Sequence, residues 1–448
     1  MAQNNAAAQA VSSVFRTPEL KDKILFTLLC LLVYRIGAHI TAPGVDVVAL
    51  TDFFRNQSQN GGGLLGLYDL FTGGQLSRAT VFALGIMPYI SASIFLQIAG
   101  AVVPQVEKMQ KDEEGRKKIN QWTRYATVFL AAIEGWGFAL FTESLQGAVA
   151  TPGFGFKLQM AFFLTTGAVF VMWLGEQITE RGLGNGASLI IFFSIVERIW
   201  PGIGTTFRFV TTGALGAFSL LVLAAVMVAV VAAVVYMTMA ARRILIQIPQ
   251  RTMARGRMRE AARSFIPLRI NTAGVMPIVF AQSIIVVPGA FAQFFPANEF
   301  ARRLSEAFAP DTALFIVSQA ILILFFTYFY TSIIFNPIDL SENLKKQGGF
   351  IPGVKPGAKT AEYIDQVVSR ITLPGAIFLT LIALLPVVIS RAANVPFQFG
   401  GTSLLIVVGV ALDTLAQMQQ HLLLRKYDGF MKKGRLKIRG RQSAPGGF

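Results

Sequence analysis

Apolar blocks of about membrane-spanning length recur along the whole chain, and this repeat limits the possible fold more than any other feature. A helix needs about 20 predominantly apolar residues to cross the hydrocarbon core of a bilayer. Hydrophobic residues make up 53% of the 448 residues and charged residues only 14%, which is typical of an integral membrane protein. The blocks predict ten transmembrane helices, near residues 24–40, 80–103, 122–145, 158–177, 186–200, 213–240, 273–295, 312–335, 371–390 and 402–420.

The distribution of Lys and Arg predicts how these helices are oriented. Short cytoplasmic segments of membrane proteins keep an excess of Lys and Arg. When charges near helix ends are counted with the adjoining loops, alternate segments starting from the N-terminus hold 31 of the 40 Lys and Arg residues. The N-terminal tail (1–23) and the basic C-terminal tail (421–448) are therefore both predicted to be cytoplasmic.

Ten spans divide into two groups of five, at 24–200 and 213–420, joined by an external connection at 201–212. Because each group has an odd number of helices, the two groups would have opposite orientations, as in proteins built from inverted repeats. A pathway through such a protein lies near the middle of the bilayer, between the repeats. The predicted fold class is an all-α polytopic membrane protein with two inverted five-helix halves.

An interrupted apolar stretch precedes the second predicted span. The run from Leu64 to Phe71 is too short to cross a bilayer and is followed by Thr72, Gly73 and Gly74. Non-helical backbone is tolerated at membrane depth only where protein or a cavity covers it. The stretch is either a re-entrant segment that turns back inside the protein or a short amphipathic helix on the outer surface, and periodicity does not separate these alternatives.

Three predicted cytoplasmic segments are more basic than topology alone requires. The loop at 241–269 carries eight Arg with Glu260 as its only acid, the loop at 336–370 is long and rich in Gly and Pro, and the tail is again basic. Basic surfaces of this kind favour an acidic partner such as RNA or an acidic protein face.

No pattern of catalytic or metal-ligating residues is present. The chain has two histidines, His39 and His421, and a single cysteine, Cys30, and their spacing matches no metal or nucleophile motif. We therefore predict neither an enzyme nor a cofactor. Besides a pathway between the two halves, two alternatives remain: a coupled small-solute carrier, in which the central acid Glu134 would be essential, and a structural membrane scaffold.

Several long motifs carry a resemblance to one family. They are LFTGGQLSRATVFALGIMPYISASIFLQ (70–97), FVMWLGEQITERGLGNGASLIIF (170–192), RINTAGVMPIVFAQS (269–283), FNPIDLSENLKKQGGFIPGVKPGAKTAEYID (335–365) and VPFQFGGTSLLIVVGVALD (395–413). Together they closely resemble the SecY family, the channel subunits of the bacterial Sec preprotein translocase. The resemblance runs from about residue 18 to 440 and keeps the family order.

The resemblance implies a protein-conducting channel for unfolded preproteins, with a central pore between the halves and a lateral gate that releases transmembrane segments between the second and seventh spans. It implies a plug at 64–74 that contains Leu64, Leu65, Leu67, Tyr68, Leu70, Phe71, Gly73 and Gly74. The implied pore ring is Ile86, Ile90, Ile191, Val279 and Ile406. The implied lateral gate contains Ser91, Gln97, Asn271 and Val279.

The resemblance also implies partners and a location. Arg242, Arg243, Arg251, Lys345, Lys346 and Lys355 would contact the SecA motor ATPase or the ribosome, and ATP hydrolysis would belong to SecA. The small subunits SecE and SecG, signal sequences, preproteins and membrane lipids are the other expected partners. The expected location is the bacterial plasma (inner) membrane. Lys355 stands where family members usually carry Arg, so its contacts would lack the planar guanidinium fork.

Overall fold

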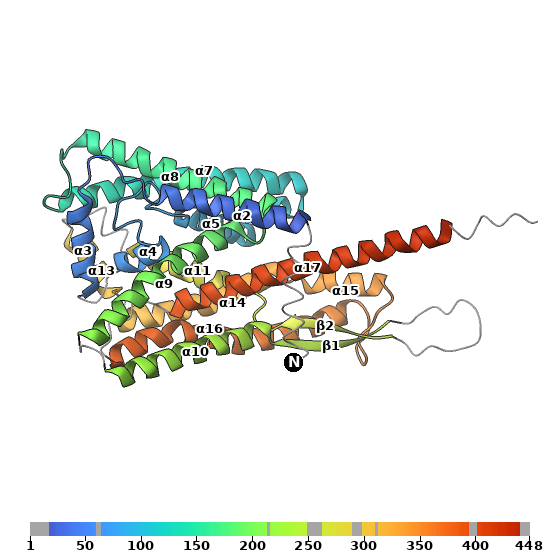
Figure 1. The fold of residues 1–448 in the computed structure, drawn as a ribbon. Helices are drawn as coiled ribbons and strands as arrows, with labels where there is room; N and C mark the ends of the chain where they lie inside the picture. Colours follow the sequence, from blue (N-terminus) through green and yellow to red (C-terminus); the bar gives the residue numbers. More distant parts are fainter. Residues whose placement is uncertain are drawn as a thin grey trace, which may run out of the picture.

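The computed structural model describes residues 18–59, 64–212, 216–248, 262–288, 298–309, 312–393 and 401–439. Long helices run roughly along one direction and form an elongated bundle (Figure 1). The helices of the first half are α2 (Pro18–Gly37), α3 (Val47–Gln59), α4 (Leu64–Phe71), α5 (Met87–Val102), α6 (Pro104–Lys111), α7 (Glu113–Ser144), α8 (Phe154–Arg181) and α9 (Gly186–Thr211). The second half contains α10 (Ala217–Met239), β1 (Ala241–Ile248), β2 (Ala262–Arg269), α11 (Met276–Ile285), α13 (Glu299–Ala307), α14 (Ala313–Ile334), α15 (Pro337–Lys346), α16 (Ala358–Ala393) and α17 (Gly401–Arg439).

The multi-span helical fold agrees with the prediction. Among the described residues, six helices are long and apolar enough to cross a membrane, or seven if the bent pair α5 and α6 is one span. The other three predicted spans overlap α2, α9 and α11. The chain turns by 107° between α5 and α6, where Pro104 begins the second helix of the pair.

Two predicted helix starts are corrected by the structure. The second span begins at Met87 and not near residue 80, because residues 81–86 form turns and Gly85 has a φ of +57°. The seventh begins at Met276, after Gly274 with a φ of +64°. Both helices have a proline in their first turn, a position at which the missing N–H costs no helical hydrogen bond.

The predicted loops contain more regular structure than the sequence suggested. The loop at 241–269 contains an antiparallel hairpin in which Ala241 pairs with Arg269 and Ile248 with Ala262. The loop at 336–370 contains α15 and the first turns of α16, the connection at 201–212 continues α9 as far as Thr211, and the C-terminal tail extends α17 to Arg439. The hairpin and α15 lie at one end of the bundle and α3 and α13 at the other (Figure 1).

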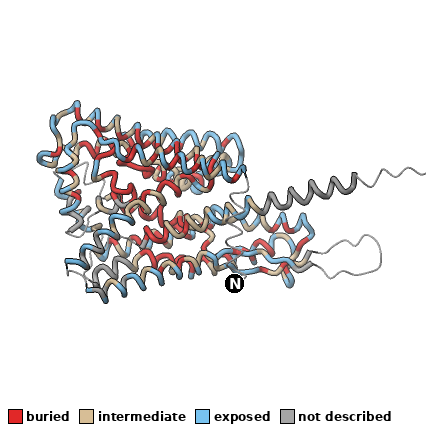
Figure 2. Tube along the Cα trace, in the orientation of Figure 1, coloured by how far each residue is buried: buried red, intermediate tan, exposed pale blue. Residues whose placement is uncertain are grey.

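The buried residues form a central core that includes parts of both halves. Figure 2 shows the buried chain concentrated inside the bundle, with exposed residues along its outer helices. The largest hydrophobic cluster takes side chains from α2, α4, α5, α8, α9, α10, α11, α14, α16 and α17. A second cluster lies within the first half, between α3, α7, α8 and the turns before α5. Exposed apolar residues on the outer helices, such as Phe162 and Tyr236, are consistent with a lipid-facing surface.

Candidate functional site

Among the described helices, the most extensive contacts between the two halves are those of α5 with α11 and of α9 with α17. All five residues of the expected pore ring lie on these helices or directly before them. Ile86 caps the N-terminus of α5 and Ile90 follows on the same helix; the others lie on α9, α11 and α17. Each of the five side chains is at most 4% exposed, and all belong to the same hydrophobic cluster. The fold therefore brings together residues that are separated by up to 320 positions along the sequence.

The short helix α4 lies inside the protein and not on its outer surface. Its last residue, Phe71, is 4% exposed and belongs to the same cluster as the ring residues. Asp69 and Thr72 are also buried. Tyr68 is half-buried and packs against three separate hydrophobic clusters. The re-entrant alternative is therefore the correct one. The backbone at Leu64, Leu65, Leu67 and Leu70 is helical, whereas their side chains lie outside the described part of the structure.

Two glycines make the turn that follows α4. Gly73 has a φ of +74° and Gly74 a φ of +82°, a backbone region that glycine adopts without steric cost. A Cβ atom at Gly73 would lie 3.0 Å from the carbonyl oxygen of Ser194 on α9. The turn thus requires glycine both for its backbone conformation and for its close approach to α9.

Polar contacts around α4 were not predicted from the sequence. The carboxylate of Asp69 forms an ion pair with Arg198 on α9, with an Oδ2 to N distance of 3.0 Å. The neighbouring Glu197 forms an ion pair with Arg35 on α2. An acid inside an eight-residue apolar run, and an acid–base pair inside an apolar block, are the signals that could have indicated these contacts.

Glu134 on α7 was the candidate for the carrier alternative. In the structure its carboxylate lies 3.3 Å from the hydroxyl of Tyr68 on α4. Among the described residues, no group of three or more His, Cys, Asp and Glu side chains could hold a metal ion. The contact of Glu134 therefore favours a role in holding α4.

The expected gate helices, α5 and α11, pack directly against each other. A cavity of about 330 Å³ adjoins them and is lined by Ser93 and Gln97 on α5 and by Met276 on α11, among other residues. Ser91 is half-buried and Val279 is buried. Gln97 donates a hydrogen bond to Ser93 of its own helix at 3.0 Å.

Asn271, the other polar residue of the expected gate, lies before α11 and is 7% exposed. Its side-chain oxygen accepts no hydrogen bond from the described residues. No hydrogen bond between Gln97 and Asn271 is present in this part of the chain, so the structure does not pair these two polar residues.

Most of the expected docking residues gather around the hairpin. Arg242 and Arg243 on β1 are exposed, as are Lys345 and Lys346 at the end of α15 and Lys355 in the following loop. Gln247 of β1 exchanges backbone hydrogen bonds with Phe350, at 3.0 Å in each direction, which fixes the hairpin to that loop. Arg251 lies outside the described residues.

A small core supports this basic surface. Ile244 and Ile246 on β1 and Leu268 on β2 are buried against residues of α15 and α16. In ARRILIQI, isoleucine recurs at every second position, 244, 246 and 248, and a period of two is typical of a half-buried strand. That pattern could have revealed the hairpin from the sequence.

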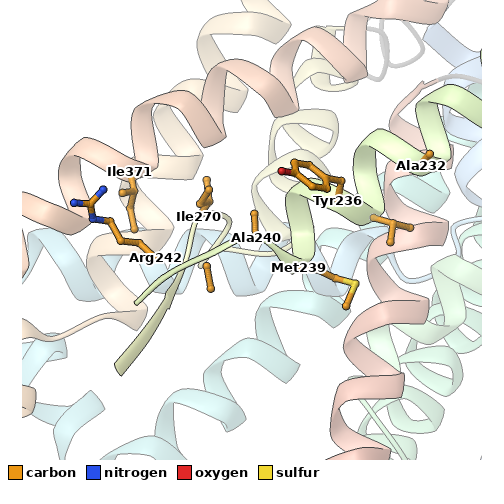
Figure 3. Close-up of a pocket in the computed structure, with 9 residues that line it drawn as sticks. Ala232, Tyr236, Met239, Ala240, Arg242, Ile270 and Ile371 are labelled. Carbon is orange, nitrogen blue, oxygen red and sulfur yellow. The ribbon is translucent and has the colours of Figure 1, made fainter. Parts of the chain in front are cut away.

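A groove of about 870 Å³ lies on the outside of the second half, between α10, the start of the hairpin and α16 (Figure 3). It is lined by Tyr236 and Met239 on the exposed face of α10, and Arg242 lies at one end. The opposite face of α10 contributes Val230 and Val234 to the central cluster. The groove therefore lies outside the interface between the halves.

Comparison with known proteins tests the sequence-based interpretation. The family model described as SecY matches residues 80–415. The chain belongs to the SecY family. Protein translocase subunit SecY of Aquifex aeolicus is 41% identical over 433 residues, covering 95% of this chain and all of the relative. The corresponding subunit of Pseudomonas aeruginosa is 44% identical over 423 residues, covering 94% of this chain and 95% of the relative.

Solved structures agree with the fold. A structure described as that of a protein-conducting channel has a TM-score of 0.64 at 15% identity, covering 89% of this chain and 92% of the other. A structure of a canine ribosome-channel complex has a TM-score of 0.60 with the same coverage. As a member of the SecY family, the protein is a protein-conducting channel of a Sec translocase, and not an enzyme. It is a multi-pass membrane protein with bacterial relatives.

Proposed function

We propose that the five clustered residues Ile86, Ile90, Ile191, Val279 and Ile406 form the constriction of this channel. Branched apolar side chains can close around an unfolded chain without competing for its hydrogen bonds, and a hydrophobic constriction excludes ions by dewetting. The observation that carries this proposal is their common burial on the four helices that join the halves. The passenger would be an unfolded preprotein passing outward from the cytoplasm.

In the same proposal, α4 and the Gly73–Gly74 turn form the plug. The buried position of Phe71 in the cluster of ring residues supports this role. A related structure is described as showing that the plug domain of the SecY protein stabilises the closed state and maintains a membrane seal. The other expected plug residues, Leu64, Leu65, Leu67, Tyr68 and Leu70, belong to the same helix.

The lateral gate would open between α5 and α11. Separation of these helices would expose a signal sequence or transmembrane segment to lipid, where apolar segments are retained and a charge at the helix centre costs about 3 kcal/mol. Ser91, Gln97, Asn271 and Val279 would border the opening. The direct packing of α5 on α11 supports this assignment.

The hairpin surface would receive the motor SecA or a ribosome. Exposed basic side chains gather there above a small hydrophobic core, and such a surface attracts acidic partners by complementary charge. Two related structures are described as channels bound to ribosomes, one canine and one from yeast. SecE and SecG are the expected small subunits. The plasma (inner) membrane, with both termini cytoplasmic, is the proposed location, since it places the basic surface on the cytoplasmic side.

Crosslinking to a stalled secretory chain tests the proposed path. A photoreactive residue placed at position 406 should crosslink to a preprotein that is held halfway through the channel. The matched control places the photoreactive residue at position 236. Tyr236 is 80% exposed and lines the outer groove, so this variant should not crosslink to the preprotein. Equal crosslinking at both positions, or none at position 406, would remove the cluster from the path.

A further inference from the structure

Helix α4 is held to the first half by polar contacts with α7, α9 and the turns before α5. The hydroxyl of Tyr68 lies 3.1 Å from the carbonyl oxygen of Leu84 and 3.3 Å from the carboxylate of Glu134 on α7. The hydroxyl has one proton to share between these two acceptors. Asp69, the next residue, forms its ion pair with Arg198 on α9.

The ion pair of Asp69 is well enclosed. The Asp69 side chain is 5% exposed, and its second carboxylate oxygen accepts a hydrogen bond from the backbone N–H of Ser77 at 2.9 Å. Both oxygens of the carboxylate are thus bonded. A buried carboxylate that loses its partner pays a desolvation cost without compensation, so this contact resists separation.

The second half contacts α4 in a different way. Tyr68 packs against a cluster that contains Ile285, Val286 and Phe315, and Phe71 packs within the central cluster. Within the described ranges, no hydrogen bond or ion pair joins α4 to the second half. Apolar contacts are non-directional, so the second half can slide away from α4 with few specific bonds to break.

We propose that the Asp69–Arg198 ion pair and the Tyr68–Glu134 hydrogen bond together form a latch that fixes the plug to the first half. Parting α5 from α11 then leaves α4 in place, and the pore opens fully only when the latch also breaks. The four residues are positioning residues, since they act on the pore by holding α4. This inference rests on the proposed plug function and adds a second, separate step to opening.

Two nearly isosteric variants test the latch. Asp69→Asn removes the charge of the ion pair, and Tyr68→Phe removes the hydroxyl and keeps the ring. The position of α4 is read from the rate at which a membrane-impermeant maleimide labels a cysteine placed at Thr72, in a Cys30→Ser background. Thr72 is 1% exposed in this structure, so labelling reports release of α4. The assay uses the membrane-embedded translocase without a preprotein.

Each variant should increase the labelling rate about tenfold, which corresponds to about 1.4 kcal/mol. The matched control is Glu143→Gln. Glu143 on α7 forms an ion pair with Lys157 on α8, at 2.8 Å, in the same half of the protein. Its replacement breaks an ion pair that does not involve α4. Its labelling rate should stay at the level of the unaltered protein. Unchanged labelling in both latch variants, or an equal rise in the control, would overturn the latch.

Ion conductance, measured on the same proteins in planar bilayers, separates the latch from the plug. If α4 is the plug, the latch variants should also leak more ions at rest, and the control should not. If labelling increases and conductance does not, the four residues do anchor α4, but α4 is not the plug. Failure of the latch proposal and failure of the plug proposal therefore give different experimental results.

Discussion

The substitution Ile406→Ala distinguishes a pore constriction from ordinary core packing. Ile406 on α17 is fully buried within the central cluster. Replacement by Ala removes three carbon atoms, at about 0.8 kcal/mol for each buried CH₂. With the cavity that remains, the free energy of unfolding should fall by about 2–5 kcal/mol.

A matched control exists in the same cluster. Ile323 on α14 is equally buried, belongs to the same cluster and is not a ring residue, so Ile323→Ala should lose a similar amount of stability. If Ile406 borders the constriction, only its variant also widens the narrowest part of the pore. Water then enters more easily, and the dewetting barrier to ions falls.

The assay is the ion conductance of the resting channel in planar bilayers, measured beside the thermal stability of each variant. We expect both variants to be less stable, and only Ile406→Ala to conduct more than the unaltered protein. Ile191→Ala, at a ring position on α9 that is 2% exposed, should repeat the result. Equal conductance in the Ile406 and Ile323 variants would refute the reasoning, because the increase would then follow from loss of core packing alone.

Three further outcomes are expected. Reversing Arg242 and Arg243 to Glu should slow the binding of SecA or ribosomes and reduce its dependence on salt, whereas Arg55→Glu on α3, at the opposite end of the bundle, should leave the binding rate unchanged. Gly73→Ala should lower the free energy of unfolding by about 1–2 kcal/mol, because a φ of +74° disfavours a side chain. It should also raise the ion conductance of the resting channel. Unchanged stability and conductance would show that glycine is not required at this turn. Ile246→Asp should open the hairpin to limited proteolysis while the helices stay intact, since its side chain is 3% exposed in a small core; a protease-resistant hairpin would contradict this.

The sequence alone predicted the features that depend on local composition. A bilayer admits few backbone arrangements, so apolar length and the placement of Lys and Arg were enough to predict a multi-span helical protein. Long shared motifs then indicated the SecY family, which the comparisons confirm. The starts of α5 and α11 were missed because apolar residues continue into the turns before them, and hydropathy does not distinguish a turn from a helix.

Only the tertiary structure decided which distant residues meet. Periodicity left α4 as either re-entrant or interfacial, and the burial of Asp69, Phe71 and Thr72 settled the choice. The pairing of Asp69 with Arg198 joins residues 129 positions apart, and no local pattern specifies such a partner. The physical reason is that helix formation and membrane insertion depend on neighbouring residues along the chain, whereas the latch and the ring cluster depend on how complete helices pack against one another.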